Sequence, residues 1–302
     1  MDTKKNLEAC LFLLPAGIIL LISFFIPFFQ TISLSFFDFS KDIYRPDFVL
    51  FNNYLELIKS PLFIKTILNT FYFLILCVPF LVIFPLFLAI LINQKIALKN
   101  TYKVLIYLPV VVSIVVVAIA FKWLYAPNGL LNYFLDLLNI KPIGWLCDPK
   151  FAMISTALVT IFKGVGYYMM IYLSALMSVP KELYEAIEVD GASSFKKHMV
   201  VTIPHIMPMI ALVSTINSIS ALKVFVEIYV MTKGGPLNST KTIVYYIYER
   251  AFENLDMGIA SAGAVILLFI VMGFSMLNIF VFEKDKYKIW WANLTNFGHI
   301  LF

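Results

Sequence analysis

Charged side chains are scarce in this chain. Only 14% of its 302 residues are Asp, Glu, Lys or Arg, whereas 61% are hydrophobic. A soluble domain of this length needs more polar surface to face water, so a soluble protein is excluded. Histidine and cysteine are also few, and their positions show neither metal-ligand spacing nor a CxxC pair. These residues are His198, His205, His299, Cys10, Cys77 and Cys147.

Signals of enzyme chemistry are lacking as well. No GxxxxGK[ST] segment occurs, so the chain is not expected to bind ATP through a phosphate loop of its own. The paired carboxylates of Pro180–Pro208 are flanked by lysines, which indicates surface ion pairs rather than acid–base catalysis. No basic cluster is interleaved with exposed aromatic residues, so nucleic acid is not an expected partner. We predict no catalytic residue and no metal site.

Long apolar segments make up most of the sequence. Each run is near or above the ~20 residues that a helix needs to cross the ~30 Å hydrocarbon core of a bilayer. We therefore predict an all-α integral membrane protein with six spanning helices, each of which satisfies its backbone hydrogen bonds internally. The predicted spans are Leu11–Phe37, Thr66–Gln94, Val104–Phe121, Phe151–Pro180, Met199–Leu222 and Met257–Phe282.

The distribution of lysine predicts the orientation of these spans. With six spans, both termini lie on one side of the membrane. On that side Gln94–Lys103 carries three lysines, whereas the opposite loops mix their basic residues with Asp and Glu. Because basic residues concentrate in cytoplasmic loops, both termini and Pro180–Pro208 are predicted to be cytoplasmic.

One outer loop, Thr232–Asp256, is rich in aromatic residues. Two interpretations are open: an interfacial or re-entrant helix, or a belt of aromatic side chains at the membrane surface. The residues concerned are Tyr245, Tyr246, Tyr248 and Phe252.

The charged connector Pro180–Pro208 predicts two short amphipathic helices. Pro180 suits a first helical turn, and the acidic residues that follow favour the positive end of the helix dipole. Gly191 permits a left-handed backbone that ends this helix, and a second helix is expected over Ala192–Val200 until Pro204 stops it. An apolar stripe of Leu183, Ala186 and Ile187 indicates a docking surface, or alternatively a loop that packs on its own span ends.

The connector resembles the EAA loop of permease subunits in binding-protein-dependent ABC importers. That pattern is EAA, three residues, Gly, nine residues and I-x-L-P; the chain has Ile187, Val201 and Ile203 in place of Ala, Ile and Leu. The resemblance implies a coupling helix that sits in a cleft of a cytoplasmic ATPase, with Glu185 as ionic anchor and Gly191 as hinge. The coupling residues that it implies are Glu185, Ala186, Asp190, Gly191, Ala192 and Pro204.

Further segments look like landmarks of the carbohydrate branch of these permeases. They are Phe51-Asn52-Asn53-Tyr54, Asn69-Thr70, Asn128-Gly129-Leu130-Leu131-Asn132 and Thr232-Lys233-Gly234-Gly235-Pro236. The resemblance implies the type I importer permease fold and a subunit of the maltose and glycerol-3-phosphate importer type, which pairs with a second, different permease. It divides the chain into a first helix and outer loop (1–65), a transmembrane core (66–283) and a cytoplasmic tail (284–302).

Charges inside the spans are candidates for a substrate path, because a buried ammonium costs at least about 2.5 kcal/mol and needs a partner or a wet cavity. Lys163 lies beside small residues. Lys223 has Glu227 four residues on, and the two could equally neutralise each other. By resemblance to the maltose permease, Thr160–Gly164 and Ala221–Val224 match segments that line a sugar site. The expected path residues are Ser113, Thr160, Lys163, Gly164, Tyr167 and Lys223.

The resemblance implies a transmembrane subunit of the bacterial cytoplasmic membrane that imports a sugar or oligosaccharide by alternating access. Its implied partners are a second permease, two copies of an ATPase that bind ATP and Mg²⁺, a solute-binding protein, the carbohydrate and membrane lipid. A sugar-phosphate or an acidic glycan is an alternative substrate. A secondary transporter, a channel or a membrane enzyme is the alternative class, but Glu227 is the only acid within the spans.

Overall fold

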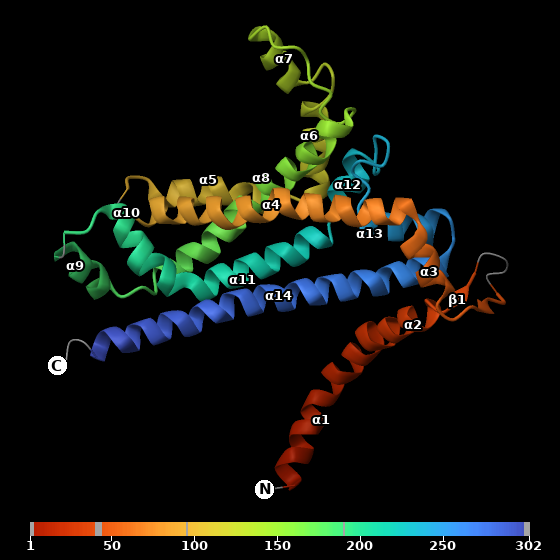
Figure 1. Ribbon diagram of the computed structural model, residues 1–302, viewed down its shortest axis with the longest axis horizontal. Coiled ribbons are helices and arrows are strands. Elements are labelled where there is room, and N and C mark those ends of the chain that lie inside the picture. Colours follow the sequence, from red (N-terminus) through yellow and green to blue (C-terminus); the bar gives the residue numbers. More distant parts are fainter. Residues whose placement is uncertain (1–2, 40–43, 95, 190, 299–302) are drawn as a thin grey trace. The chain divides into compact units, whose positions relative to one another are not determined.

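The computed structural model describes the backbone of residues 3–39, 44–94, 96–189 and 191–298, and the side chains of residues 11–282 within these ranges. Helices dominate these ranges (Figure 1). In chain order the elements are α1 (Thr3–Leu20), the π-helix η1 (Leu21–Phe25), α2 (Ile26–Leu34), β1 (Phe37–Asp38), β2 (Asp47–Phe48), α3 (Asn52–Lys59), α4 (Pro61–Asn93), α5 (Lys99–Val111), α6 (Ile114–Leu124), α7 (Leu130–Leu137), α8 (Pro149–Leu176), α9 (Lys181–Val189), α10 (Ser194–Lys197), the π-helix η2 (His198–Thr202), α11 (Ile203–Leu222), α12 (Val226–Met231), α13 (Ile243–Tyr248), the π-helix η3 (Glu249–Glu253) and α14 (Met257–Gly298).

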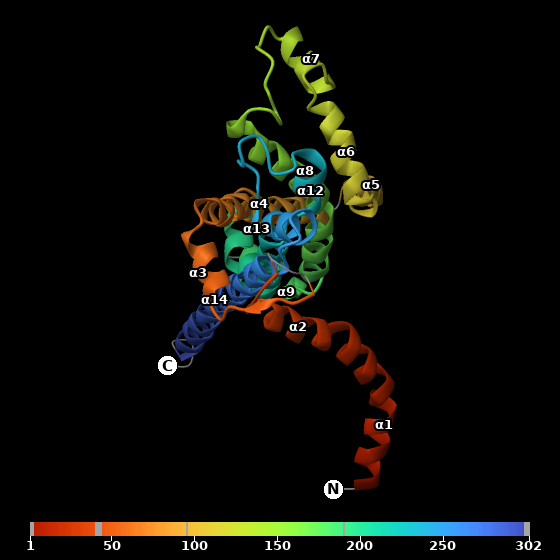
Figure 2. The ribbon, with the colours of Figure 1, turned by 90° about the vertical axis from the view of Figure 1, so that its right-hand side faces the viewer.

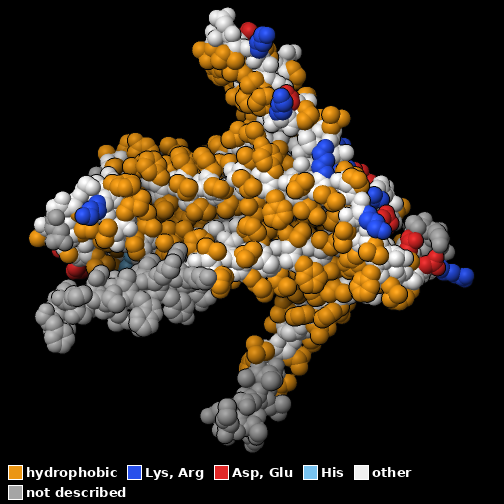
Figure 3. Space-filling view, in the orientation of Figure 1, with side chains coloured by type: hydrophobic (Ala, Val, Ile, Leu, Met, Phe, Trp, Pro, Cys, Tyr) orange, Lys and Arg blue, Asp and Glu red, His pale blue; other side chains and the backbone are white. Residues whose placement is uncertain are grey.

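Five of the predicted spans are confirmed as long apolar helices. The described residues contain helices able to cross a membrane at Leu11–Leu34, Pro61–Asn93, Pro149–Leu176, Ser194–Met231 and Met257–Phe282. Their surface is largely apolar, and charged side chains gather near helix ends and loops on the face that Figure 3 shows. The prediction of a helical membrane protein is therefore confirmed.

The third predicted span is broken. α5 and α6 meet at an angle of 94°, because Val112 and Ser113 between them are extended. Pro109 removes one helical hydrogen bond just before the break, and the β-branched residues Val110, Val111 and Val112 have low helix propensity. Figure 2 views α5 almost end-on, with α6 rising from it. Together the two helices count as at most one span.

Two compact units make up the chain, and each has its own packing. The larger unit comprises Lys65–Tyr245 and Ile270–Phe302. Its core is formed mainly by α4, α8 and α11, through buried side chains such as Phe73, Met169 and Val213. Within it α8 lies against both α5 and α11 (Figure 1). Burying such apolar groups contributes roughly 25 cal/mol per Å² where the surroundings would otherwise be water.

Gly166 is what lets α5 approach α8 so closely. A Cβ at this position would lie 2.3 Å from the backbone oxygen of Ile106, which is inside van der Waals contact. Any side chain at Gly166 would push the two helices apart. The position of the broken span thus depends on one small residue in α8.

The smaller unit comprises Met1–Ile64 and Tyr246–Phe269. Asn53 ties α3 to the end of the first span by donating from Nδ2 to the carbonyls of Ser35 and Phe37, both at 2.9 Å. Asp256 accepts a hydrogen bond from the Ile259 amide at the start of α14. The pKa of this carboxyl is raised, mainly by burial, and the Ile259 amide and the Arg250 guanidinium offset part of that rise.

The aromatic segment of the last outer loop is helical, as one of the two interpretations predicted. α13 covers Ile243–Tyr248, and Tyr245 and Tyr246 are both buried in protein. Buried rings do not serve as a belt at the membrane surface. Phe252 is exposed and so remains available for that role.

Candidate functional site

The connector between α8 and α11 folds as a helix, a turn and a second helix. Gly191 has φ +72°, so the left-handed turn predicted for it is confirmed. The turn satisfies carbonyls at the end of α9, because the Gly191 amide donates to Glu188 and the Ala192 amide to Ile187. Ser193 then caps α10 by accepting from the Lys196 amide. Asp190 lies outside the described residues.

The prediction that Pro204 ends the second helix is wrong. α10 continues through η2 into α11, and Pro204 lies in the first turn of α11. In η2 the Ile203 amide bonds the His198 carbonyl five residues back, which is the wider hydrogen-bonding pattern of a π-helix. This wider turn accommodates a proline, which lacks an amide hydrogen and crowds the carbonyl of the preceding turn.

Three side-chain contacts hold α9 on the following helix. Glu188 forms an ion pair with Lys197. The Tyr184 hydroxyl lies 2.9 Å from the Thr202 hydroxyl, and the Lys197 ammonium lies 5.6 Å from the centre of the Tyr184 ring. One face of α9 is thereby fixed to its own chain.

The opposite face of α9 is left uncovered. Glu185 and Ala186 are exposed, and so are Leu183 and Val189, at 44% and 87%. Ile187 is half-buried. Leu183 and Ala186 therefore do not pack on the span ends, which disfavours the interpretation of the connector as a self-packed loop. The connector presents a carboxylate among apolar side chains.

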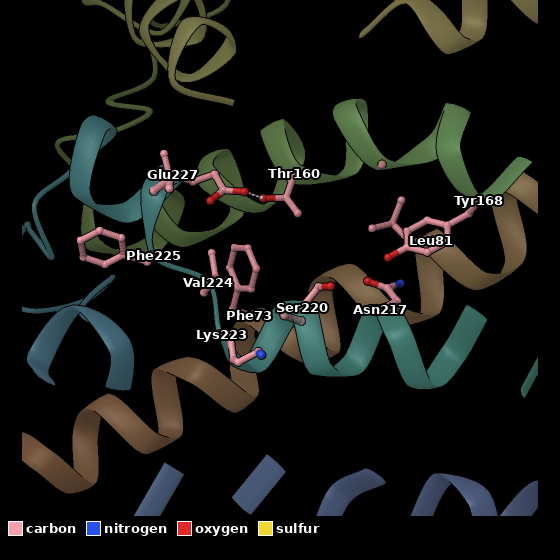
Figure 4. A pocket seen from close by; sticks show the side chains of 13 residues that line it. Phe73, Leu81, Thr160, Tyr168, Asn217, Ser220, Lys223, Val224, Phe225 and Glu227 are labelled. Atoms are coloured by element: carbon pink, nitrogen blue, oxygen red, sulfur yellow. Dashed lines mark hydrogen bonds between the residues drawn. The ribbon is translucent and has the colours of Figure 1, made fainter. Parts of the chain in front are cut away.

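A cavity of about 220 Å³ lies in the larger unit between α4, α8 and the end of α11. Residues at helical spacing form its walls: Thr160, Gly164 and Tyr168 lie along α8, and Asn217 and Ser220 lie along α11, with Lys223 directly after its end (Figure 4). Phe73 and Leu81 of α4 and the segment after α11 complete it. The lining residues are Phe73, Leu81, Thr160, Gly164, Tyr168, Asn217, Ser220, Ala221, Lys223, Val224, Phe225, Val226 and Glu227.

Two polar side chains of this cavity differ in their hydrogen bonding: the Glu227 carboxylate has a partner within the protein, and the Asn217 amide nitrogen has none among the described residues. The Thr160 hydroxyl donates to Glu227 Oε1 at 2.9 Å, so two segments 67 residues apart meet here (Figure 4). Asn217 is only 2% exposed, and its Nδ2 has no hydrogen-bond partner in the part of the chain that the structure describes. Because a buried amide without a partner costs free energy, Asn217 is suited to donate to a ligand in the cavity.

Three of the six expected path residues, Thr160, Gly164 and Lys223, line this cavity. Lys163 points elsewhere, since its ammonium donates to the Val110 carbonyl at 3.1 Å. The last carbonyls of a helix lack helical partners, and a cation there is favourable. Lys163 thus supports the end of α5 at the break. Ser113 lies at the same break and is exposed, as is Tyr167 on α8.

Of the two alternatives for Lys223, its pairing with Glu227 is not seen among the described residues. α11 ends at Leu222 and α12 begins at Val226, so the two residues do not share a helical face. Glu227 is bonded to Thr160 instead. Sequence reasoning also missed Phe73, Tyr168, Asn217 and Ser220 as lining residues. The spacing of Asn217, Ser220 and Lys223 was the available signal.

The loop after α12 is held by a dense set of hydrogen bonds. Asn69 of α4 donates to the carbonyls of Asn238 and Lys241, at 2.8 and 2.9 Å. The Thr240 hydroxyl donates to the Gly235 carbonyl and lies 2.7 Å from the Thr232 hydroxyl. The Gly234-Gly235-Pro236 segment therefore belongs to a fixed loop of the larger unit. No group of His, Cys, Asp or Glu able to hold a metal occurs in the described ranges.

Comparison with known proteins gives consistent matches. The family model described as "Binding-protein-dependent transport system inner membrane component" matches residues 58–283. The "Probable ABC transporter permease protein YurN" of Bacillus subtilis is 32% identical over 293 residues, covering 95% of this chain and 99% of the relative. The "Lactose transport system permease protein LacF" of Rhizobium radiobacter is 31% identical over 240 residues, covering 78% and 80%. A solved chain of a bacterial ABC transporter for import of the acidic polysaccharide alginate is 26% identical, with a TM-score of 0.82, covering 94% of this chain and 97% of that chain.

Proposed function

The chain belongs to the family of binding-protein-dependent transport system inner membrane components, and on that premise we propose that it carries a sugar or an oligosaccharide across the bacterial inner membrane. It is a transmembrane subunit of an ATP-driven importer that depends on a solute-binding protein, and it is not an enzyme. The substrate class follows from relatives described as lactose and alginate transporters. The acidic nature of alginate makes an acidic glycan a second candidate.

The exposed face of α9 supports the coupling role and is the observation that carries the proposal. Glu185 and Ala186 stand free on that face, while Glu188 and Tyr184 are used to hold the helix in place. A rigid helix with an uncovered carboxylate and apolar neighbours suits docking into another protein. We assign to it an ATPase subunit, with Glu185 as anchor, Gly191 as the turn and Pro204 at the start of the span that moves. Ala186, Asp190 and Ala192 complete the proposed contact.

The cavity supports the passage of a sugar. Sugar hydroxyls both donate and accept hydrogen bonds, and the lining offers Asn217 and Lys223 as donors, Glu227 as an acceptor and the Phe73 ring as a flat apolar face. Thr160 and Gly164 form the wall opposite α11. Ser113 and Lys163 are proposed as path residues at the break of the third span, and Tyr167 as a path residue on the exposed face of α8, all outside this cavity.

The remaining parts of the transport cycle lie in other subunits. Two ATPase copies bind ATP and Mg²⁺ and close on each other, which pushes this chain and a second permease from the inward-open to the outward-open state. Hydrolysis resets the inward state. The proposal places both termini and α9 in the cytoplasm, and the loops after α2, α6 and α12 on the outer side, from which the solute-binding protein delivers the sugar.

The substitution Glu185→Lys tests the coupling role. Reversing the anchor's charge should abolish uptake and uncouple or lose the ATPase, while the protein still inserts in the membrane. Glu253→Lys, at an exposed carboxylate of η3, is the matched control and should transport normally. Sugar uptake and ATP hydrolysis are measured on the same preparation of membrane vesicles. Normal transport by the Glu185→Lys variant would refute the docking role of α9.

A further inference from the structure

The charges of the cavity indicate which carbohydrates it accepts. Among the residues that line it there is one cation, Lys223, and one carboxylate, Glu227. Lys163, the other lysine of this region, donates to the Val110 carbonyl and is not part of the lining. The lining is therefore formally neutral. A site that selects anions normally presents an excess of Lys or Arg.

The carboxylate of Glu227 is fixed where a ligand would meet it. The Thr160 hydroxyl holds Oε1 at 2.9 Å, and Lys223 lies on the other wall, at the end of α11 (Figure 4). No ion pair of Glu227 with a cation is present among the described residues, so its negative charge is not cancelled by direct contact. A carboxylate accepts hydrogen bonds from hydroxyls and repels other carboxylates, phosphates and sulfonates.

We propose that Glu227, oriented by Thr160, makes the cavity selective for uncharged carbohydrates against acidic ones. The inference rests on the proposed function, because it concerns the site through which the sugar passes. Asn217 Nδ2 and the Lys223 ammonium donate to the oxygens of the sugar, and Glu227 accepts from its hydroxyls. The same carboxylate excludes uronates and sugar phosphates. On this inference an acidic glycan is the less favoured of the two substrate candidates.

The experiment compares neutral and acidic trisaccharides on the assembled transporter in lipid nanodiscs. The neutral probes are maltotriose, cellotriose and xylotriose, and the acidic probe is trigalacturonate. Equilibrium titration should give at least one neutral probe an affinity at least about 10-fold higher than that of trigalacturonate, because the Glu227 carboxylate repels the carboxylates of the acidic probe. The substitution Glu227→Gln keeps an acceptor for Thr160 and removes the charge. It should therefore lower the ratio of the affinity for the neutral probe to the affinity for trigalacturonate at least about 10-fold.

Two further variants separate the effect of the Glu227 charge from a general effect of substitution on the fold. Glu227→Asp keeps the charge and should keep most of the discrimination. Glu56→Gln makes the same chemical change on α3, where Glu56 is exposed, and should leave the ratio as in wild type. An unchanged ratio in Glu227→Gln, or equal wild-type affinity for trigalacturonate and the neutral probes, would overturn the inference.

The outcome also distinguishes this inference from the proposed function. Transport of an acidic glycan delivered by the solute-binding protein would refute the selectivity and leave sugar import standing. If the wild-type transporter neither binds any of the trisaccharides nor takes up any carbohydrate with its solute-binding protein, the proposed function fails and the inference fails with it.

Discussion

Three asparagines, of which Asn53 and Asn132 are buried and Asn69 is half-buried, show what single residues contribute to this fold. Asn53, Asn69 and Asn132 each bond backbone groups outside their own helix, and those of Asn69 lie about 170 residues further along the chain. Asn132 forms the most hydrogen bonds of the three. Its Nδ2 donates to the carbonyls of Ala126, Pro127 and Ile143. Its Oδ1 accepts from the Ile143 amide and from Trp145 Nε1. These three asparagines thus serve to fix loops.

The substitution Asn132→Ala should destabilise the loop around α7. It leaves buried backbone groups without partners, at about 1–3 kcal/mol for each unsatisfied group. We expect a lower melting temperature of the purified complex and faster proteolysis between Leu124 and Pro149. Asn128→Ala, at an exposed position of the same segment, is the control and should behave as wild type. Equal stability of the two variants would contradict the role of Asn132.

At the scale of elements, the helices were predictable and the break between α5 and α6 was not. Hydropathy reports how apolar a segment is, and Val104–Phe121 is apolar throughout whether or not its helix is continuous. The break is stabilised by contacts that the local sequence does not show: Lys163 donates to the Val110 carbonyl, 53 residues away, and Gly166 admits the backbone of Ile106.

The site was predicted in part for the same reason. Thr160, Gly164 and Lys223 could be identified from resemblance, and all three line the cavity. The contact between Thr160 and Glu227 joins α8 to α12 and depends on the interruption of the helix at Lys223. Local spacing left a Lys223–Glu227 pair open as one alternative, since a helix would bring residues four apart together.

The substitution Gly166→Ala tests how α5 docks on α8. The added methyl would overlap the Ile106 carbonyl, and because this neighbour is backbone, the helices must move apart. We expect a loss of about 1–3 kcal/mol in stability, measured by thermal melting, together with reduced uptake. Gly273→Ala on α14 is the control, since its methyl would meet nothing within 4 Å. Equal melting temperatures for the two variants would show that the close approach is not needed.

At the scale of the whole molecule, the chain divides two tasks between distant segments. The helices of the larger unit enclose a cavity with groups suited to a carbohydrate, and α9 presents an uncovered carboxylate for a partner. In the proposed function, ATP chemistry belongs to that partner, which would distinguish this chain from a self-sufficient secondary transporter. The chain belongs to the family of binding-protein-dependent inner membrane components and resembles the solved alginate transporter chain over 94% of its length.

The most direct test of this account is uptake of radiolabelled carbohydrate into proteoliposomes that contain the assembled transporter. We predict uptake only when ATP is present on the side of α9 and the cognate solute-binding protein on the other side. Omitting either should reduce uptake to the level of empty liposomes. Uptake driven by an ion gradient alone, without ATP or the binding protein, would contradict the account.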